Sequence, residues 1–362
     1  MPLKANSAPQ ADPAPIFEIF RGSLGTELLV AAIAHFNVFE ILSADPVAPD
    51  KLREKIGLAE RPAAVLFTAL RAFGLVSADK AGRLLLTGMA REHLVPGAPF
   101  DVSDYVSLTR DNPGVLEIVA RLKSNKPAGS DKPATKKSGS GMPPKKSGVA
   151  FIYRKGMDSA MEEEAAARKL TLALAGRAKN CAPVLAQKVD LRKTRVLLDA
   201  GGGTGIYSIA CLQQYPALRA IVWDRPEVLK VAAEMAAAYG VANRLECRPG
   251  DMFADPVPEG VDAILLSNIL HDWDIPECRT LVRRCADALP SSGKLLIHDA
   301  FLNDAQDGPV AVALYSAALF GLTEGRAYSG AEYREWVTEA GLKPSKAVDT
   351  LVHCSVLTSL KK

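Results

Sequence analysis

A histidine stands just beyond a predicted buried strand in the C-terminal half of the sequence. The apolar run of residues 261–266 has the length of a buried strand, and the stretch SNILHDWD, residues 267–274, follows it. An imidazole group has a pKa of about 6.5, so it can accept and release a proton near neutral pH. His271 is therefore a candidate general base, and the alternative is a histidine that only packs or caps.

The residues after His271 have ordinary structural explanations. Asp274 is followed three residues later by Glu277, which is the spacing of a capping box and predicts a helix that runs through Leu289. Trp273 is expected to pack beneath that helix, although its place beside His271 also keeps it among the residues that could touch a substrate.

A glycine-rich turn joins a predicted strand at residues 195–199 to a helix. The turn reads DAGGGTGI over residues 199–206, and the nicotinamide fingerprint G-x-G-x-x-G would need a small residue where the chain has Ile206. The spacing G-x-G-x-G after an acid is instead typical of S-adenosylmethionine-dependent methyltransferases. Their cofactor has no phosphate groups, and the turn carries no lysine to bind one. The candidate cofactor residues of this turn are Asp199, Gly201, Gly203 and Gly205.

Two further acids follow the next two predicted strands. Asp224 comes after residues 219–223, where a carboxylate can accept hydrogen bonds from both ribose hydroxyls. Asp251 comes after residues 245–249 and can accept from an adenine amine while Met252 packs on the ring. One glycine turn could have a purely steric explanation, but three suitable strand ends in order favour a cofactor site. The candidates at these and the following strand end are Asp224, Asp251, Met252, Phe253 and Ser267.

Alternating strands and helices must position these residues. Such alternation predicts a doubly wound α/β sheet, in which ligands lie at the carboxyl ends of the strands. The predicted strands are residues 195–199, 219–223, 245–249, 263–267 and 294–298, with a C-terminal hairpin at 343–349 and 353–359.

The N-terminal part has a different pattern. Residues 16–95 carry apolar residues at helical spacing, a helix-turn-helix is predicted from Asp50, and a short hairpin at residues 77–87 adds a β-wing. Such a winged helix could bind DNA, but its second helix carries only Arg61 and Arg71. We therefore expect it to serve dimer packing.

The basic charge of the chain is concentrated in one segment. Seven lysines and one aspartate between residues 123 and 146 give a local charge of +6, whereas the whole chain has a formal charge of +3. The segment 124–149 is rich in Lys, Pro, Gly and Ser and predicts a flexible insertion. A tether for nucleic acid or membrane is the less favoured alternative.

Residues 1–15 and the cysteines bear on location. The leader is proline-rich and lacks the apolar segment of a signal peptide, so we expect it to be disordered. The six cysteines form no C-x-x-C pair, as is usual for reduced cytosolic thiols, and they offer no metal geometry. A cytoplasmic protein without a metal is expected.

Taken together, the glycine turn, the D-x-P and GDMF stretches and the HDW stretch resemble the family of plant caffeate and flavonoid, acetylserotonin and bacterial polyketide O-methyltransferases. The resemblance implies a winged-helix dimerisation domain at residues 16–123, a Rossmann-like catalytic domain at residues 150–362, and a homodimer. It also implies a role in binding S-adenosylmethionine for Gly201, Gly203, Asp224, Asp251 and Met252.

The same resemblance assigns the chemistry. It implies that His271 is the general base and that Asp299, after the fifth strand, holds it. The family's second acid, in a G-x-E-R-T motif, corresponds to Ala327 here, and a family lysine near the adenine corresponds to Ser267. His298 remains a less favoured second base.

A flat aromatic acceptor is expected in a pocket closed by residues 151–157 and 310–321, although the second segment could equally be a plain core helix. The favoured function is O-methylation of a small phenolic or polyketide-like hydroxyl. Ala327 leaves open a diverged enzyme with other chemistry, such as hydroxylation, decarboxylation, or C- or N-methylation, and the winged helix leaves open a transcriptional regulator. The pocket candidates are Met157, Asn268, Trp273, Tyr315 and Leu319.

Overall fold

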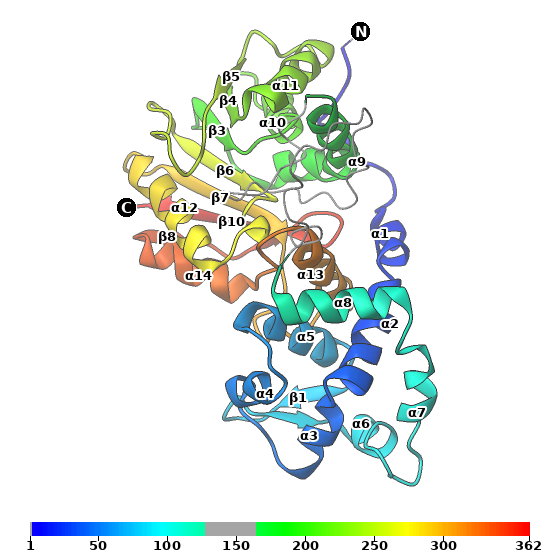
Figure 1. The fold of residues 1–362 in the computed structure, drawn as a ribbon. Helices are drawn as coiled ribbons and strands as arrows, with labels where there is room; N and C mark the ends of the chain where they lie inside the picture. The colour runs from blue at the N-terminus through cyan, green and yellow to red at the C-terminus, as the bar shows by residue number, and fades with distance from the viewer. Residues whose placement is uncertain (1, 127–163) are drawn as a thin grey trace, which may run out of the picture. The chain divides into compact units, whose positions relative to one another are not determined.

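The computed structural model describes residues 2–126 and 164–362 and divides into two compact units (Figure 1). The sheet unit comprises Met1–Phe17, Asp158–Asp304 and Tyr328–Lys362. The helical unit comprises Glu18–Met157 and Ala305–Ala327. Most of the lysine-rich insertion, and the segment that contains Met157, lie outside the described residues.

The sheet unit is built on a mixed sheet with the order β5-β4-β3-β6-β7-β10-β8, and β9 pairs with β10. The first five strands in this order are parallel, whereas β10 runs antiparallel to β7, β8 and β9. The strands are β3 (Val196–Ala200), β4 (Arg219–Asp224), β5 (Leu245–Pro249), β6 (Ala263–Ser267), β7 (Lys294–Ala300), β8 (Leu342–Pro344), β9 (Val348–Asp349) and β10 (Cys354–Lys361).

Helices cover both faces of this sheet, because successive strand side chains point to opposite sides and both sides are apolar. Leu197 belongs to one buried cluster and Leu198 to another. Helices α9 (Glu164–Lys188), α10 (Ile206–Gln214) and α11 (Pro226–Ala238) pack in the first cluster, and α12 (Ile275–Ala288) and α14 (Gly330–Glu339) in the second (Figure 1). The predicted doubly wound α/β fold is confirmed.

The parallel strands bring their carboxyl ends to one edge of the sheet. Asp224 ends β4, and Ser267 ends β6. Strand β7 extends two residues beyond the predicted 294–298, so Asp299 lies within the strand and pairs with Ser355 of β10. The sheet therefore places the candidate acids and the HDW segment at a common edge.

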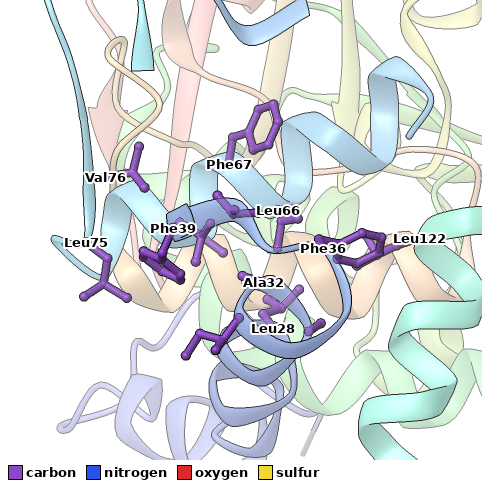
Figure 2. Packing of buried hydrophobic residues seen from close by; sticks show 14 of the residues in the cluster. Leu28, Ala32, Phe36, Phe39, Leu66, Phe67, Leu75, Val76 and Leu122 are labelled. Carbon is purple, nitrogen blue, oxygen red and sulfur yellow. The ribbon is translucent and has the colours of Figure 1, made fainter. Parts of the chain in front are cut away.

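The helical unit has its own apolar core (Figure 2). Leu28, Phe39 and Leu66 are fully buried in it, and Leu122 contributes from a later helix. Its helices are α2 (Ser23–Val30), η1 (Ala31–His35), α3 (Val38–Ala44), α4 (Pro49–Lys55), α5 (Glu60–Ala72), α6 (Gly88–His93), α7 (Ser103–Val106), η2 (Ser107–Thr109), α8 (Pro113–Ser124) and α13 (Val310–Leu322), while α1 (Ala14–Phe20) spans the boundary between the two units.

Two helices and a short hairpin lie in the region where a helix-turn-helix and a β-wing were predicted. Helices α4 and α5 are followed by β1 (Val76–Ala78) and β2 (Leu84–Leu86), which pair antiparallel. Asp79 forms the turn between the two strands by accepting from the backbone N–H groups of Ala81 and Arg83. The local sequence therefore determines this hairpin.

The two arginines of α5 are bound inside the helical unit. Arg61 is 6% exposed and donates to the carbonyl groups of Thr323 and Gly325, and its guanidinium lies 4.5 Å from the ring centre of Phe320. Arg71 forms an ion pair with Asp307. Because these charges already have partners, α5 is poorly suited to contact DNA phosphates.

The prediction of a disordered leader is wrong for residues 2–15. Gln213 of α10 accepts from the backbone N–H of Ala5 and donates to the carbonyl of Leu3, and Ala5 is buried. The proline-rich composition hides this order, because backbone groups rather than an apolar periodicity make these contacts.

The unit boundaries and one helix start also differ from the expectations. Residues 305–327 belong to the helical unit because α13 packs against α5 and α2. Asp274 caps α12 by accepting from the N–H of Ile275, but Glu277 does not complete a capping box, and its buried Oε2 has no partner within the described chain.

Among the described helices none is by itself both long and apolar enough to cross a membrane. The segments Ser23–His35 and Val38–Ala44 are long and apolar enough for a membrane span only when they are taken together, and the chain bends by 60° between them.

Candidate active site

His271 lies buried between two carboxylates on a single turn of 3₁₀ helix, η4 (Leu270–Asp272). Its Nδ1 atom is 2.5 Å from Oδ1 of Asp299, and its Nε2 atom is 3.5 Å from Oδ1 of Asp272. A close hydrogen bond to a carboxylate fixes the ring and places the proton on Nδ1, so Nε2 is the basic nitrogen of the neutral ring.

Backbone contacts on both sides hold this short turn. Asn268 has a φ of +57°, and its N–H donates to the carbonyl of His298, so the chain turns sharply as it leaves β6. Asp274 then begins α12. His271 is thus held between the end of a strand and the start of a helix, which suits a side chain that needs a fixed orientation.

The charges around His271 favour its protonated form. Burial alone would lower its pKa, but the carboxylates of Asp299 and Asp272 outweigh burial, so the pKa of His271 is raised. Burial raises the pKa of Asp272 to about 6. Although burial opposes ionisation of Asp299 too, the His271 charge and hydrogen bond prevail, so the pKa of Asp299 is lowered. Asp299 therefore stays ionised as the partner of a basic His271.

Asp299 has further partners around its carboxylate. Its Oδ1 atom also accepts from the N–H of Ala300 at 2.8 Å, and Oδ2 accepts from the hydroxyl of Tyr333 at 3.1 Å. Tyr333 lies on α14 and is fully buried. Tyr333 is not recognisable from the sequence as a site residue, because an aromatic residue at helical spacing is typical of a core position.

The glycine turn at the end of β3 adopts a backbone that only glycine takes readily. Gly201, Gly203 and Gly205 all have positive φ angles, between +59° and +69°. A Cβ atom at Gly203 would meet nothing within 4 Å, whereas one at Gly201 would lie 2.5 Å from the side chain of Ile269. Ile269 is two residues before His271, so the turn and the histidine segment are in direct contact.

Asp224 and Met252, which follow the next two strands, meet the same turn. Asp224 accepts from the N–H of Gly203 at 2.9 Å. Asp251 accepts from the N–H of Phe253 at 2.8 Å, and the tip of Met252 would be 3.4 Å from a Cβ at Gly201. Asp224 and Met252, predicted from separate motifs, therefore border one glycine turn, and Asp251 shapes the loop that carries Met252.

Asp199 beneath the turn provides a test of fit for a cofactor. It is 1% exposed, and Oδ2 accepts from the hydroxyl of Ser208, but the buried Oδ1 has no partner among the described residues. Burial raises the pKa of Asp199 to about 7. An acid with an unsatisfied oxygen next to the partly exposed glycine turn suits a ligand that brings a cationic or N–H donor, as the methionine part of S-adenosylmethionine does.

Ser267 and His298 form a separate buried network. The Ser267 hydroxyl lies 2.8 Å from Nδ1 of His298, and Nε2 of His298 lies 3.0 Å from the Thr350 hydroxyl. Burial and the charge of Arg177 lower the pKa of His298 to about 3. Both ring nitrogens are thus engaged in a neutral side chain, which argues against His298 as a second base.

Asn268 is held by Arg177, a residue that no sequence motif marks. Arg177 of α9 donates to the Asn268 side-chain carbonyl at 2.6 Å, and the Asn268 amide donates to the hydroxyl of Tyr207. A lone arginine in a long helix carries no motif, so only the fold brings it to this edge.

The remaining pocket candidates are dispersed. The ring of Trp273 packs edge-on against Phe253, and its carbonyl accepts from the hydroxyl of Tyr328, so its packing role is accounted for. Tyr315 and Leu319 belong to the helical unit, and their place in the pocket stays a prediction, as does that of Met157.

The described residues contain no group of three His, Cys, Asp or Glu side chains able to hold a metal ion. Cys278 and Cys285, on one face of α12, are both buried and unpaired.

Three comparisons with known proteins bear on this site. The family model described as "O-methyltransferase domain" matches residues 144–343. The 3-hydroxy-5-methyl-1-naphthoate 3-O-methyltransferase of Streptomyces sahachiroi is 35% identical over 338 residues, which cover 93% of this chain and 91% of that protein. A solved O-methyltransferase family 2 protein from Planctomyces limnophilus, in complex with apigenin, is 45% identical with a TM-score of 0.86 and covers 99% of both chains. Human N-acetylserotonin methyltransferase, solved with SAM, is similar in fold, with 19% identity, a TM-score of 0.58 and coverage of 98% of this chain and 99% of that chain.

Proposed function

The chain belongs to the O-methyltransferase family, and from that premise we propose that it transfers the methyl group of S-adenosyl-L-methionine to a hydroxyl of a small aromatic metabolite. The similar proteins from Streptomyces sahachiroi and Planctomyces limnophilus act on a hydroxynaphthoate and bind apigenin, respectively. Both of these molecules are flat and carry phenolic hydroxyls, which supports a phenolic or polyketide-like acceptor.

One observation carries the proposal. The HDW segment contacts the glycine turn through Ile269 and Gly201, so His271 lies at the same edge of the sheet as the candidate cofactor residues. A base beside a methyl-donor site is the arrangement that methyl transfer to a hydroxyl requires. Neither a regulator nor a simple binding protein would need the buried pair of His271 and Asp299.

S-adenosyl-L-methionine, when bound, supplies a methyl group made electrophilic by its sulfonium. A phenol has a pKa of about 10 and is mostly neutral at pH 7, so its oxygen becomes a good nucleophile only as its proton leaves. Nε2 of His271 accepts that proton, because Nδ1 is tied to Asp299. Asp299 and Asp272 then stabilise the imidazolium that forms. Such base catalysis contributes about 10²–10⁴-fold to the rate.

The cofactor role of the strand ends stays a proposal with a physical basis. Asp224 can accept from the ribose hydroxyls while it keeps its bond to Gly203. Asp199 offers its unsatisfied Oδ1 to the methionine part. The remaining cofactor candidates are Gly205, Asp251, Met252, Phe253 and Ser267, of which Ser267 is already bonded to His298.

A second reaction within the same family rests on Ala327, which stands where the G-x-E-R-T motif has an acid. A relative that is 28% identical over 318 residues is an L-tyrosine C(3)-methyltransferase from Streptomyces lavendulae. If this chain shared that reaction, the methyl group would be attached to a ring carbon and not to oxygen. Two-dimensional NMR of the isolated product distinguishes the two positions directly.

We further propose that the helical unit mediates a homodimer. Several of its large apolar side chains have more than three quarters of their surface exposed to solvent, which is unfavourable in free energy unless a partner covers them. They are Ile19, Phe20, Tyr105 and Leu108. Sedimentation equilibrium should give twice the chain mass of 38.6 kDa, and a monomer at micromolar concentration would contradict the proposal.

The cysteines support a cytoplasmic location. None of the described six is paired, and five of them are buried, which suits a compartment that keeps thiols reduced. Cell fractionation with a periplasmic marker would test it, and recovery with that marker would count against it.

The function is tested with purified protein, S-adenosyl-L-methionine carrying a labelled methyl group, and a panel of phenols, hydroxynaphthoates and flavones. We expect label in a methyl ether of at least one acceptor and one equivalent of S-adenosylhomocysteine. Binding of S-adenosylhomocysteine without transfer to any acceptor, or label attached to carbon, would overturn O-methylation.

A further inference from the structure

The hydroxyl of Tyr333 is hydrogen-bonded to a buried carboxylate. It donates to Oδ2 of Asp299 at 3.1 Å, on the side of the carboxylate opposite to His271. Asp299 is 1% exposed, so water has little access to Oδ2. The hydroxyl therefore supplies the hydrogen bond that keeps the second oxygen from being a buried, unsatisfied charge.

The packing of α14 needs the ring of Tyr333 but not its hydroxyl. The ring centre lies 4.7 Å from that of Phe301, 5.4 Å from Trp336 and 6.0 Å from Tyr328. A phenylalanine would make the same ring contacts, and a hydroxyl in such an apolar cluster costs free energy unless it is bonded. The polar atom is thus explained by Asp299 and not by the core.

The hydroxyl is a permanent donor. Burial, together with the nearby charge of Asp299, raises the pKa of Tyr333 well above its ordinary value, so it keeps its proton at every working pH. Ala327 supplies no acid, and the described hydrogen bonds of Asp299 come from His271, Ala300 and Tyr333.

We propose that Tyr333 is a positioning residue that fixes Asp299 and thereby sets the basicity of His271. The tyrosine O–H holds Oδ2, so Oδ1 stays directed at Nδ1 of His271, and it withdraws charge from the carboxylate. This inference rests on the proposed function for its consequence in catalysis, but the hydrogen-bonded chain itself can be measured in the absence of any substrate.

Other groups face this chain and must remain unchanged in the test. They lie on helices α9, η4 and α12 and on strands β7 and β10, and each exerts an electrostatic effect on His271, Asp299 or Tyr333. They are Arg177, Asp272, Cys278, His298 and Cys354.

The test is the pKa of His271 in Tyr333→Phe, measured by NMR titration of protein labelled at histidine Cε1. The chain has only five histidines, and the signal missing from His271→Asn assigns the one of interest. Without the hydrogen bond from the hydroxyl, the Asp299 carboxylate carries more negative charge and stabilises the imidazolium of His271 more strongly. We therefore expect the pKa of His271 to rise by roughly half a unit to one unit.

Tyr328→Phe is the matched control. Tyr328 is equally buried in the same aromatic cluster, but its hydroxyl donates to the carbonyl of Trp273 and not to a carboxylate. We expect it to lower the melting temperature and to leave the pKa of His271 in place. In Asp299→Asn, adding Tyr333→Phe should produce no further shift, because the effect passes through Asp299.

A His271 pKa that is unchanged or lower in folded Tyr333→Phe overturns the inference, and so does an equal shift in Tyr328→Phe. Where the enzyme methylates a phenol, Tyr333→Phe should lower kcat about threefold or more, leave KM near wild type, and move the rise of kcat to higher pH. A wild-type enzyme that methylates nothing would refute the proposed function while the NMR result still decides the role of Tyr333.

Discussion

Replacement of Asp199 by asparagine should stabilise the protein in the absence of ligand. Asp199 is almost fully buried, with one oxygen bonded to Ser208 and the other without a described partner. Burial, aided by the charge of Asp224, raises its pKa from 3.8 to about 7. Asparagine has nearly the same shape and carries no charge, so Asp199→Asn removes the cost of ionisation without leaving a cavity.

The magnitude follows from linkage. In the unfolded chain Asp199 ionises near its ordinary pKa, whereas in the folded protein it ionises at about 7. The stability that the neutral carboxyl contributes is fully present below the unfolded pKa and is lost as the pH rises through the folded one. At about 1.4 kcal/mol per pKa unit, the wild type loses on the order of 4 kcal/mol by pH 8, of which roughly 2 to 3 kcal/mol is lost above pH 5.

The assay is urea unfolding at pH 5, 6, 7 and 8, followed by circular dichroism. We expect the free energy of unfolding of Asp199→Asn to exceed that of wild type by a margin that grows across this range. Asp299→Asn is the control, and it should lower the free energy of unfolding, because the pKa of Asp299 is lowered and its ionised form is paired with His271. A margin for Asp199→Asn that does not change with pH, or a loss of stability, would refute the reasoning.

Two further predictions concern the cofactor turn and the base. Gly201→Ala should destabilise the protein by about 1–3 kcal/mol and weaken the binding of S-adenosylhomocysteine, because φ is +68° and the new Cβ would lie 2.5 Å from Ile269. Urea unfolding measures the loss of stability, and calorimetry measures the binding. Binding as tight as that of the wild type would count against the assigned cofactor turn. Asp299→Asn should lower kcat about 10²-fold or more, because an amide no longer fixes the His271 tautomer. Calorimetry should find a cofactor affinity within about twofold of that of the wild type. An unchanged kcat would show that Asp299 has no part in the chemistry.

Local patterns predicted the parts of this protein that local physics determines. The glycine turn needs positive φ angles, and strands buried on both faces need continuous apolar runs, so both could be recognised from residues close in sequence. The contact between His271 and Asp299 was anticipated from the family resemblance, and the parallel pairing of β6 with β7 brings the two strand ends to one edge.

Contacts between distant segments could not be predicted in the same way. Tyr333 and Arg177 lie on helices whose patterns are those of ordinary core and surface positions, and only the fold brings them to Asp299 and Asn268. The leader has no apolar periodicity that would predict its order, because backbone hydrogen bonds to Gln213 hold it in place. The apolar sequence of helix α13 does not indicate in which of the two units the helix packs.

The measurement that tests the central claim most directly compares His271→Ala with wild type on two acceptors of similar shape, a phenol of pKa about 10 and an acidic phenol of pKa about 7. A general base matters only where the oxygen must still lose its proton. We expect kcat/KM at pH 8 to fall about 10²-fold or more for the first acceptor and by less than about tenfold for the second. Equal losses on both acceptors, or no loss on either, would contradict proton removal by His271.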